Sequence, residues 1–375
     1  MTTSLSTALD NALHQARLAV GISNPNPHVG CVLLSAQGEC IGSGHTQVVG
    51  GPHAEVMALR DARARGQSTV GATAFVTLEP CSHHGRTPPC CDALVAAGVA
   101  RVVVAVLDPN PLVSGRGVAR LQAAGVAVEV LPPDDPQAQA ARALNVGFFS
   151  RMQRQMPWVR MKMAASLDGI TALPNGSSQW ITGEAARADG HAWRARACAV
   201  LTGIGTVLED DPMLDVRAVP TTRQPHVVVV DSRLETPPEA RLLGPAAQGL
   251  PRQVWIYTAV DDPARRAALQ AQGAQVVLLP NESSKVNLRA MLQDLARREV
   301  NTVHLEAGEK LNGSFLREGL VDECLLYLAP KLLGQGAGLS NLGPLTALSE
   351  GVSLTLRDVA PVGEDLRLIA EVVRR

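Results

Sequence analysis

The chain has 375 residues, of which 46% are hydrophobic and 18% charged, and its formal net charge at pH 7 is −1. Because this length exceeds what one hydrophobic core usually serves, we expect two domains. A near-neutral chain lacks the basic surplus of nucleic-acid binders, and 3% aromatic residues offer little surface for stacking bases, so composition argues against a polynucleotide partner.

Cysteine usage and hydropathy bear on the compartment. The seven cysteines are an odd number without the regular spacing of a disulfide framework, which favours a reducing environment. From the first residues we expect no secretory leader, and no apolar run approaches the roughly 20 residues of a membrane span. We therefore expect a cytoplasmic protein with no membrane partner.

The first half of the chain alternates predicted helices with short apolar strands. A helical period covers 4–19, and the Asn- and Pro-rich stretch 24–30 is predicted to be a loop. The alternation that follows is typical of an α/β layered domain. Strands are predicted at 31–34, 74–78, 102–106 and 126–130, and helices at 53–65, 90–97, 117–124 and 135–149.

The second half repeats this rhythm, with strands predicted at 159–164, 199–202, 226–230, 254–257, 275–279, 302–305 and 324–328. Helices are predicted at 184–196, 262–272, 288–298 and 312–318. The polar, basic stretch from Arg151 to Pro157 is predicted to connect the two domains. We place the domains at 1–150 and 151–375.

The segment Gly51-Pro52-His53-Ala54-Glu55, with Cys81 and Cys90 further on, indicates a catalytic zinc site. One histidine and two thiolates give zinc three protein ligands and leave its fourth position for water. His-x-Glu followed by Pro-Cys-x-x-Cys is typical of zinc nucleobase deaminases, in which the glutamate moves protons without binding the metal. We therefore predict His53, Cys81 and Cys90 as zinc ligands and Glu55 as the catalytic acid and base.

The identity of the third ligand is open, because eight residues separate Cys81 from Cys90 where the short motif has two. Cys91, His83 and His84 are close enough in sequence to compete. We favour Cys90, since a thiolate at the start of the predicted helix benefits from the helix dipole. Cys91 would point about 100° away on that helix.

A second candidate site follows the predicted strand 302–305. The sequence from Leu305 to Ser314 contains Gly308 and Gly313 and leads into a helix, so its backbone N–H groups are suited to a pyrophosphate. The Gly-x-Gly-x-x-Gly pattern of dinucleotide-binding folds does not follow any predicted strand here. Taken alone, this glycine-bearing turn is more often only a turn.

Several motifs resemble one known family, the bifunctional riboflavin-biosynthesis deaminase/reductases. In the first half they are Pro25-Asn26-Pro27-x-Val29-Gly30, Gly51 to Glu55, Thr77 to Cys90, and Asp108-Pro109-Asn110-Pro111. In the second half they are Lys162-x-Ala164-x-Ser166-Leu167-Asp168-Gly169, Ser178 to Thr182, Thr206-Val207-x-x-Asp210-Asp211-Pro212, Glu306-Ala307-Gly308 and Ala329 to Gly334. The resemblance spans nearly the whole chain.

The resemblance implies a cytidine-deaminase-like three-layer domain followed by a dihydrofolate-reductase-like domain that binds NADPH without a Rossmann motif. The first would deaminate 2,5-diamino-6-ribosylamino-4(3H)-pyrimidinone 5′-phosphate, and the second would reduce the ribosyl side chain to ribityl. It also implies a homo-oligomer. Substrate contacts in the first half would come from Asn26, His45 and the loop 83–87.

In the second half, the resemblance implies a cofactor site and a substrate site. The cofactor residues would be Ala164, Trp180, Thr206, Asp210, Ser232, Gly308, Glu309, Lys310, Leu311, Asn312, Gly313 and Ser314. The substrate residues would be Lys162, Ser178, Arg194, Arg217 and Glu306.

Residue chemistry supports part of this second site. Arg194 and Arg217 have planar guanidinium groups that suit a phosphate. Ser232 and Arg233 are suited to a 2′-phosphate, whereas Asp231 favours a free ribose hydroxyl, so the choice of NADPH over NADH rests on the resemblance. A carboxylate at a strand end, as at Glu306, needs a partner such as a substrate donor.

Two functions from other classes agree less well with the sequence. A polynucleotide (RNA) deaminase with a C-terminal binding module conflicts with the net charge and the low aromatic content. A structural zinc protein does not explain Glu55 or a set of only three good ligands, since structural zinc usually has four.

Overall fold

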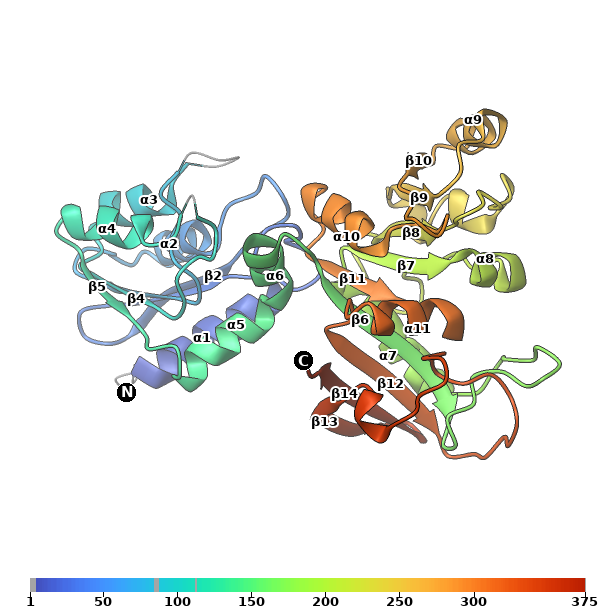
Figure 1. The fold of residues 1–375 in the computed structure, drawn as a ribbon. Helices are drawn as coiled ribbons and strands as arrows, with labels where there is room; N and C mark the ends of the chain where they lie inside the picture. The colour runs from blue at the N-terminus through green and yellow to red at the C-terminus, as the bar shows by residue number, and fades with distance from the viewer. Residues whose placement is uncertain (1–4, 84–87, 112, 375) are drawn as a thin grey trace. The chain divides into compact units, whose positions relative to one another are not determined.

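The computed structural model describes residues 5–83, 88–111 and 113–374, and the chain divides into two compact units, Met1–Gln155 and Met156–Arg375 (Figure 1). The break between Gln155 and Met156 falls a few residues after the boundary predicted near 151. Each unit is built around its own sheet. Among the described residues, no helix has the length and apolarity needed to cross a bilayer.

The first unit contains a five-stranded sheet with the order β2-β1-β3-β4-β5. β1 pairs antiparallel with both β2 and β3, while β3, β4 and β5 run parallel. Their side chains are mostly apolar and, in β1, fully buried, because helices cover both faces of the sheet. The strands are β1 (Gly30–Leu34), β2 (Cys40–His45), β3 (Thr73–Val76), β4 (Arg101–Val104) and β5 (Ala127–Val130).

Figure 1 shows the helices of this unit in two layers, with α1 and α5 together on one face of the sheet and α2, α3 and α4 on the other. The layers place the starts of α2 and α3 near the end of β3, where the predicted zinc ligands lie. The helices are α1 (Leu5–Leu18), α2 (Ala54–Ala64), α3 (Cys90–Ala96), α4 (Arg116–Ala123), α5 (Pro136–Leu144) and α6 (Val146–Arg154).

The prediction of one helix over 135–149 was wrong. Two helices, α5 and α6, meet at Asn145, whose φ and ψ of −116° and 20° interrupt the helical path. The buried side chain of Asn145 hydrogen-bonds to the loop residue His28, so a tertiary contact overrides the helical periodicity. The stretch predicted as a domain crossing is helical as far as Arg154.

The second unit contains a nine-stranded sheet with the order β10-β9-β8-β7-β11-β6-β12-β14-β13. Its strands run parallel from β10 to β12, and the hairpin β13–β14 closes one edge antiparallel. The strands are β6 (Trp158–Ser166), β7 (Ala199–Gly203), β8 (His226–Val230), β9 (Val254–Thr258), β10 (Gln275–Leu278), β11 (Thr302–Leu305), β12 (Glu323–Ala329), β13 (Leu354–Val362) and β14 (Asp365–Val372).

Helices cover both faces of this sheet. One core joins the sheet to α10 and α11, and two smaller cores on the other side include residues of α7 and α9. The helices are α7 (Glu184–Arg196), α8 (Ile204–Asp210), α9 (Pro263–Ala271), α10 (Leu288–Arg297) and α11 (Glu309–Arg317), with short 3₁₀ turns at Arg241–Leu243, Ala247–Gly249 and Leu348–Glu350.

Three strands and one α-helix were not predicted from the sequence, and one helix start was misplaced. β2 contains two glycines, β13 contains Pro361 and is exposed along most of its length, and α8 has only seven residues. β14 has apolar residues at every second position from Leu366 to Val372, so its strand pattern is present in the sequence. The helix predicted to start at Asn312 begins at Glu309. The residues from Glu309 to Ser314 therefore belong to a helix and not to a turn.

Candidate active sites

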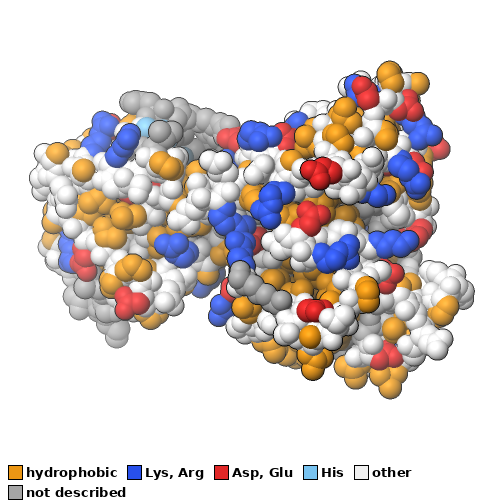
Figure 2. Space-filling view, in the orientation of Figure 1, with side chains coloured by type: hydrophobic (Ala, Val, Ile, Leu, Met, Phe, Trp, Pro, Cys, Tyr) orange, Lys and Arg blue, Asp and Glu red, His pale blue; other side chains and the backbone are white. Residues whose placement is uncertain are grey.

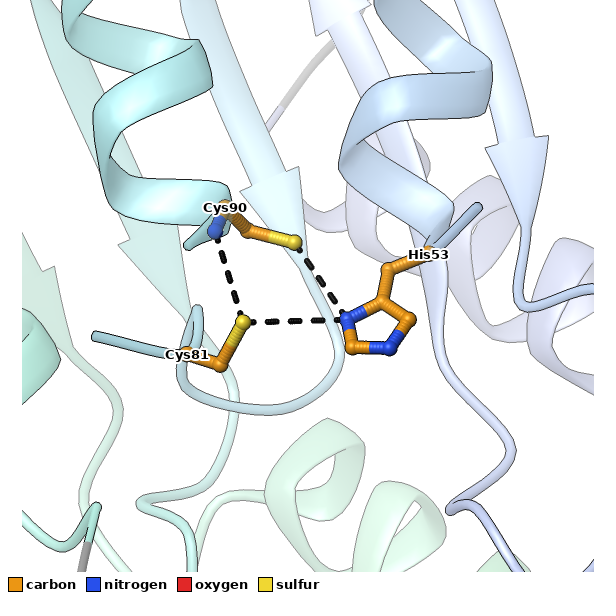
Figure 3. Close-up of side chains that lie close together, drawn as sticks. All are labelled: His53, Cys81 and Cys90. Atoms are coloured by element: carbon orange, nitrogen blue, oxygen red, sulfur yellow. Dashed lines mark hydrogen bonds between the residues drawn. The ribbon is translucent and has the colours of Figure 1, made fainter. Parts of the chain in front are cut away.

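His53, Cys81 and Cys90 come together in the first unit, and their ligand atoms all lie within 4.8 Å of one another. His53 Nδ1 is 3.7 Å from Cys81 Sγ and 3.4 Å from Cys90 Sγ (Figure 3). His53 immediately precedes α2, Cys90 is the first residue of α3, and Cys81 lies on the loop after β3. Two helix starts and one strand end therefore meet at this cluster.

The competing candidates for the third ligand lie elsewhere or outside the described residues. The Cys91 thiol is turned away from the cluster and donates to the carbonyls of Pro80 at 3.2 Å and Gly117 at 3.5 Å. His83 is exposed. His84 and the rest of the predicted substrate loop, 84–87, are outside the part of the chain that the structure describes.

The cluster is prepared to bind a cation. Hydrogen bonding from Cys90 lowers the pKa of Cys81 to about 4, with His53 acting in the same direction against the effect of burial. The hydrogen bond to Cys81 raises the pKa of His53. The backbone N–H of Cys90 also donates to Cys81 Sγ at 3.3 Å. A thiolate thus lies among donors and is ready for a metal.

The donor set and its spacing fit zinc. With Zn–S and Zn–N bonds of roughly 2.3 and 2.0 Å, the ligand atoms of a tetrahedral site lie roughly 3.5 Å apart. The separations of 3.4 and 3.7 Å between His53 Nδ1 and the two sulfurs match this spacing. A site with one histidine and two cysteines leaves a fourth position open, as catalytic zinc requires.

Glu55 lies in the first turn of α2 and is 3% exposed. Burial, reinforced by the negative charge of Cys81, raises its pKa to about 7. Glu55 is close enough to the Cys90 thiol to share a hydrogen bond with it. A carboxyl group at the edge of a metal-ligand cluster is placed to exchange protons with what the metal binds.

The two substrate residues predicted in this unit lie on different segments. Asn26 is on the loop before β1. The side chain of Asn145 holds this loop, because it accepts from the His28 N–H at 2.7 Å and donates to the His28 carbonyl at 3.0 Å. His45 ends β2, and its Nδ1 is 3.3 Å from Oε1 of Gln15 on α1. Burial lowers the pKa of His45, so its ring is neutral at pH 7.

A second polar cluster lies in the second unit where β6 and β11 face α7. Arg194 on α7 forms a two-pronged ion pair with Glu306, at 2.8 and 2.9 Å, and both side chains are nearly buried. Burial alone would raise the pKa of Glu306, but Arg194, His304 and Lys162 hold it well below its usual range. Burial lowers the pKa of Lys162. Three of the five predicted substrate residues therefore form one cluster.

Arg217 is joined to this cluster through Asp215. Arg217 Nη1 lies 2.7 Å from Asp215 Oδ1, and Arg194 Nη1 donates to the Asp215 carbonyl at 2.5 Å. The adjacent Val216 is held by the side chain of Gln224, which accepts from its N–H at 2.7 Å and donates to its carbonyl at 2.8 Å. Half of the Arg217 side chain remains exposed, at 51%.

Ser178 and three predicted cofactor residues lie around the loop between β6 and α7 and around α8. Trp180 is 64% exposed, with the Arg187 guanidinium 4.6 Å from the centre of its ring. Asp210 ends α8 and lies 3.4 Å from the amide of Gln179. Thr206 is in the first turn of α8, and Ala164 is on β6. Among the described residues, no hydrogen bond joins Ser178 to the cluster of Arg194 and Glu306.

The remaining predicted cofactor residues divide into exposed and structural ones. Gly308 precedes α11 without a capping side chain, and a Cβ built there meets no atom within 4 Å. Asn312 and Gly313 are buried: the Asn312 amide donates to the Leu339 carbonyl, and Gly313 lies against the Asn341 backbone. The Ser232 hydroxyl accepts from the Val286 N–H at 3.1 Å, and Asp231 is fully buried and bonded to Thr236. Glu309, Lys310, Leu311 and Ser314 all lie on α11.

Sequence reasoning missed the residues that hold the site loops. Glu79, Asn145 and Gln224 are buried polar side chains that bond to backbone groups, at a separation of 38 residues for Glu79 and Gly117, 117 for Asn145 and His28, and 8 for Gln224 and Val216. Glu79 is part of the motif that contains Cys81, but neither its burial nor its partners can be read from spacing. Asn145 carries one usable signal, since asparagine is a poor helix former in the middle of a predicted helix.

The family described as "Cytidine and deoxycytidylate deaminase zinc-binding region" matches residues 2–106, and the family described as "RibD C-terminal domain" matches residues 157–368. The first match contains His53, Glu55, Cys81 and Cys90. The second covers more than half of the chain and most of the second unit.

Relatives and solved structures match both halves together. "Riboflavin biosynthesis protein RibD" of Escherichia coli (strain K12) is 42% identical over 370 residues, which is 95% of this chain and 96% of that protein. The structure of Acinetobacter baumannii RibD, form 1, has a TM-score of 0.87 at 40% identity and covers 98% of both chains. A deaminase/reductase structure from Thermotoga maritima has a TM-score of 0.84 at 30% identity and 98% coverage of both chains.

These matches decide between the alternatives. A C-terminal nucleic-acid-binding module is not favoured, because the second unit matches a reductase domain along most of its length. A structural zinc protein does not account for a match to a deaminase zinc-binding region. With 42% identity across nearly its full length to a RibD protein, the chain belongs to the RibD family of bifunctional deaminase/reductases of riboflavin biosynthesis.

Proposed function

We propose that this enzyme first deaminates 2,5-diamino-6-ribosylamino-4(3H)-pyrimidinone 5′-phosphate and then reduces the ribosyl side chain of the product to ribityl with NADPH. The observation that carries the proposal is the pair of clusters, His53, Cys81, Cys90 with Glu55 in one unit and Lys162, Arg194, Glu306 in the other. The similar Thermotoga maritima protein is named as a diaminohydroxyphosphoribosylaminopyrimidine deaminase and a 5-amino-6-(5-phosphoribosylamino)uracil reductase, which supports the same two steps here.

In the first unit, His53, Cys81 and Cys90 would hold zinc, and Glu55 would transfer protons. When bound, zinc acts as a Lewis acid that makes water a nucleophile near neutral pH. Glu55 would take a proton from that water and pass it to the departing ammonia. Its burial keeps bulk water from competing for this proton.

Asn26 and His45 would orient the pyrimidine in the first unit. Asn26 can both donate and accept, as recognition of a ring amide requires. The neutral ring of His45 offers one donor and one acceptor, and its contact with Gln15 fixes its orientation. The loop 83–87 would contribute further contacts.

In the second unit, Arg217 would bind the substrate phosphate. Arg194 is fully engaged by Glu306 and by the Asp215 carbonyl, whereas Arg217 keeps part of its guanidinium exposed. Arg194 would then hold the Glu306 carboxylate in place to accept from the hydroxyl groups of the sugar chain. Lys162, with its pKa lowered by burial, would donate near the reacting carbon, and Ser178 would close this site.

NADPH would lie along the carboxyl ends of β7, β8 and β11 and supply the hydride. The uncapped start of α11 after Gly308 offers backbone N–H groups for a pyrophosphate. Ser232 retains a hydroxyl proton for a 2′-phosphate, since its oxygen accepts from Val286. Asp231 is buried and bonded to Thr236, which removes the residue that would favour a free ribose hydroxyl.

The same proposal implies a small-molecule substrate, a homo-oligomer and a cytoplasmic location. Figure 2 shows acidic and basic side chains interspersed on the visible face of the second unit, a pattern that suits a small substrate better than a polynucleotide. We place the enzyme in the cytoplasm, where its thiolate ligands stay reduced. Exposed apolar side chains on the edge hairpin, including Leu354, Leu356 and Val359, support a homo-oligomer.

One assay tests both activities. The purified zinc-loaded enzyme is given the diamino substrate, and ammonia release and NADPH oxidation are followed together. We expect ammonia without NADPH, and NADPH oxidation only after deamination. NADH in place of NADPH should support the second step far less well. Equal rates with NADH, or NADPH oxidation without prior ammonia release, would contradict the proposed sequence.

A further inference from the structure

Glu79 lies two residues before the ligand Cys81, yet it takes no part in the chemistry proposed above. Its side chain is buried, at 3% exposure, and its carboxylate accepts four backbone hydrogen bonds. Oε2 accepts from Asp108 at 3.2 Å and Gly115 at 3.0 Å, and Oε1 accepts from Gly117 at 2.9 Å and Val118 at 3.2 Å. Each oxygen thus has two N–H donors.

Three of these donors belong to the start of α4. Gly115 is the N-cap residue of this helix and has no side chain to satisfy the first N–H groups, so the carboxylate of Glu79 takes that role from another part of the chain. An anion at a helix N-terminus is also favoured by the helix dipole. Glu79 therefore ties α4 to the segment that carries Cys81.

The start of α4 contacts the residues on both sides of Cys81. A Cβ at Gly117 would lie 2.1 Å from the Pro80 carbonyl oxygen, so only glycine permits this approach. Arg120, also on α4, donates to the Ser82 carbonyl at 2.9 Å. The Cys91 thiol connects the Pro80 and Gly117 carbonyls from the side of α3.

We propose that Glu79 is a positioning residue of the metal centre, which fixes α4 against Pro80 and Ser82 and so sets the place of the Cys81 thiolate. The inference rests on the proposed zinc site. Cys81 lies on a loop, and a loop ligand keeps its place only if the neighbouring backbone is held. Groups outside the ligand set that orient a ligand typically change metal affinity by about 10- to 100-fold when they are replaced.

The test replaces Glu79 with glutamine in the full chain. Glutamine keeps the size of the side chain, but its amide nitrogen would face two N–H donors and lose their hydrogen bonds. We expect Glu79→Gln to raise the zinc dissociation constant, measured by chelator competition, by about 10- to 100-fold. The absorption of the cobalt-substituted protein should also change, because it reports the geometry of the thiolates.

The matched control is Glu129→Gln, which makes the same chemical change on β5 of the same unit, where the carboxylate pairs with Arg101 at the surface. It should leave zinc affinity and the cobalt spectrum unchanged. Circular dichroism and the unfolding transition of each variant show whether the first unit is folded, and reductase activity shows that the second unit is intact. A role of Glu79 in fold stability alone would lower the unfolding midpoint but leave both metal readouts of the folded protein as in the wild type.

A second variant keeps the proposal testable if Glu79→Gln does not fold. Gly117→Ala keeps the Glu79 carboxylate in the sequence, but its Cβ pushes the Pro80 backbone away from α4 and crowds the Glu79 side chain. It should weaken zinc binding in the same way. Wild-type metal affinity and cobalt spectrum in either folded variant would overturn the proposal. Absence of zinc from the wild-type protein would instead refute the proposed function.

Discussion

The side-chain amide of Asn145 forms hydrogen bonds with both main-chain polar groups of His28, 117 residues earlier in the chain. Oδ1 accepts from the His28 N–H at 2.7 Å, and Nδ2 donates to the His28 carbonyl at 3.0 Å. Asn145 is 3% exposed and separates α5 from α6. The loop that carries Asn26 is therefore fixed from the far end of the first unit.

Replacing Asn145 with aspartate should weaken substrate binding in the deaminase. Aspartate keeps the acceptor for the His28 N–H but sets a second oxygen against the His28 carbonyl. The amide nitrogen also donates to the Ala141 carbonyl within α5, a second bond that aspartate loses. The bond lost to the loop costs roughly 0.5–1.5 kcal/mol, so we expect the deaminase KM to rise about 2- to 10-fold with zinc still bound. Gln139→Glu, on the exposed side of α5, should leave KM unchanged. An unaltered KM in folded Asn145→Asp would show that the loop does not depend on this contact.

The two adjacent cysteines should respond differently to the same substitution. Cys90→Ser should lose zinc and ammonia release, because the Cys90 thiol is 3.4 Å from His53 within the ligand cluster. Cys91→Ser should keep most of both, because its thiol donates to two carbonyls, as a hydroxyl also can. Metal content by mass spectrometry and ammonia release measure these effects. The reverse result would assign the ligand to Cys91.

Glu55→Gln should retain zinc but lose turnover. The carboxylate lies outside the group of three ligand atoms, and an amide cannot move protons. We expect kcat for deamination to fall by at least the roughly 10² to 10⁴ that a general acid or base contributes. NADPH oxidation with the deaminated intermediate should be unchanged. Loss of stoichiometric zinc from this variant would place Glu55 among the ligands.

Gly308→Val should affect cofactor binding without disturbing the fold. A side chain at this position meets no atom of the protein within 4 Å and lies at an ordinary backbone conformation, so the variant should fold normally. If the pyrophosphate lies against the start of α11, the NADPH dissociation constant should rise more than about tenfold, or about 1.4 kcal/mol. Gly308→Ala should give a smaller rise. Wild-type affinity in both variants would move the cofactor away from this helix.

The stability of the second unit should fall in mild acid because of His226. Its Nδ1 accepts from the Gln253 N–H at 3.0 Å, and burial together with Arg223 lowers its pKa to about 4, from an ordinary value of 6.5. The unfolded chain therefore binds the proton more readily than the folded one. The stability that neutral His226 contributes is fully present above pH 6.5 and is lost as the pH falls from 6.5 towards 4.

Urea unfolding followed by tryptophan fluorescence at about pH 7 and pH 5 tests this expectation, since all four tryptophans, at 158, 180, 193 and 255, lie in the second unit. In His226→Asn, asparagine can accept the same hydrogen bond but does not titrate. The variant should be less stable at neutral pH, because it loses the ring contact with Trp255, but should depend less on pH. The pKa of His191 is also lowered, so the free energy of unfolding of the variant should still fall with pH, but less steeply than that of the wild type. A slope equal to that of the wild type would contradict the assignment to His226.

Much of the fold and the metal cluster was predictable because both depend on local pattern. Apolar runs gave most strands of the two sheets, and the spacing from His53 to Cys90 pointed to a metal site whose three side chains the structure brings together. β13 was missed because it is exposed along most of its length and so lacks a buried face. The break at Asn145 was missed because its cause, the contact with His28, lies far away in the sequence.

Contacts between residues far apart in the sequence explain the remaining differences between the predicted and the observed sites. Arg194 and Glu306 were each predicted to meet substrate, but the sequence does not reveal that they bind each other across 112 residues. Their ion pair changes the role proposed for Arg194 from phosphate binding to holding Glu306. The four backbone partners of Glu79 are likewise beyond any reading of motif spacing.

Asn145 and Gln224 hold their loops with carboxamides, and a carboxamide neither gains nor loses a proton between acid and alkaline conditions. A histidine or a carboxylate in either place would release its loop when it titrated. These two contacts with the loops that carry Asn26 and Arg217 should therefore persist while the catalytic groups change charge. Any release of these loops with pH would then have to come from the titratable groups that also hold them, Asp215 beside Arg217 and His28 beside Ser23, and not from the two carboxamides.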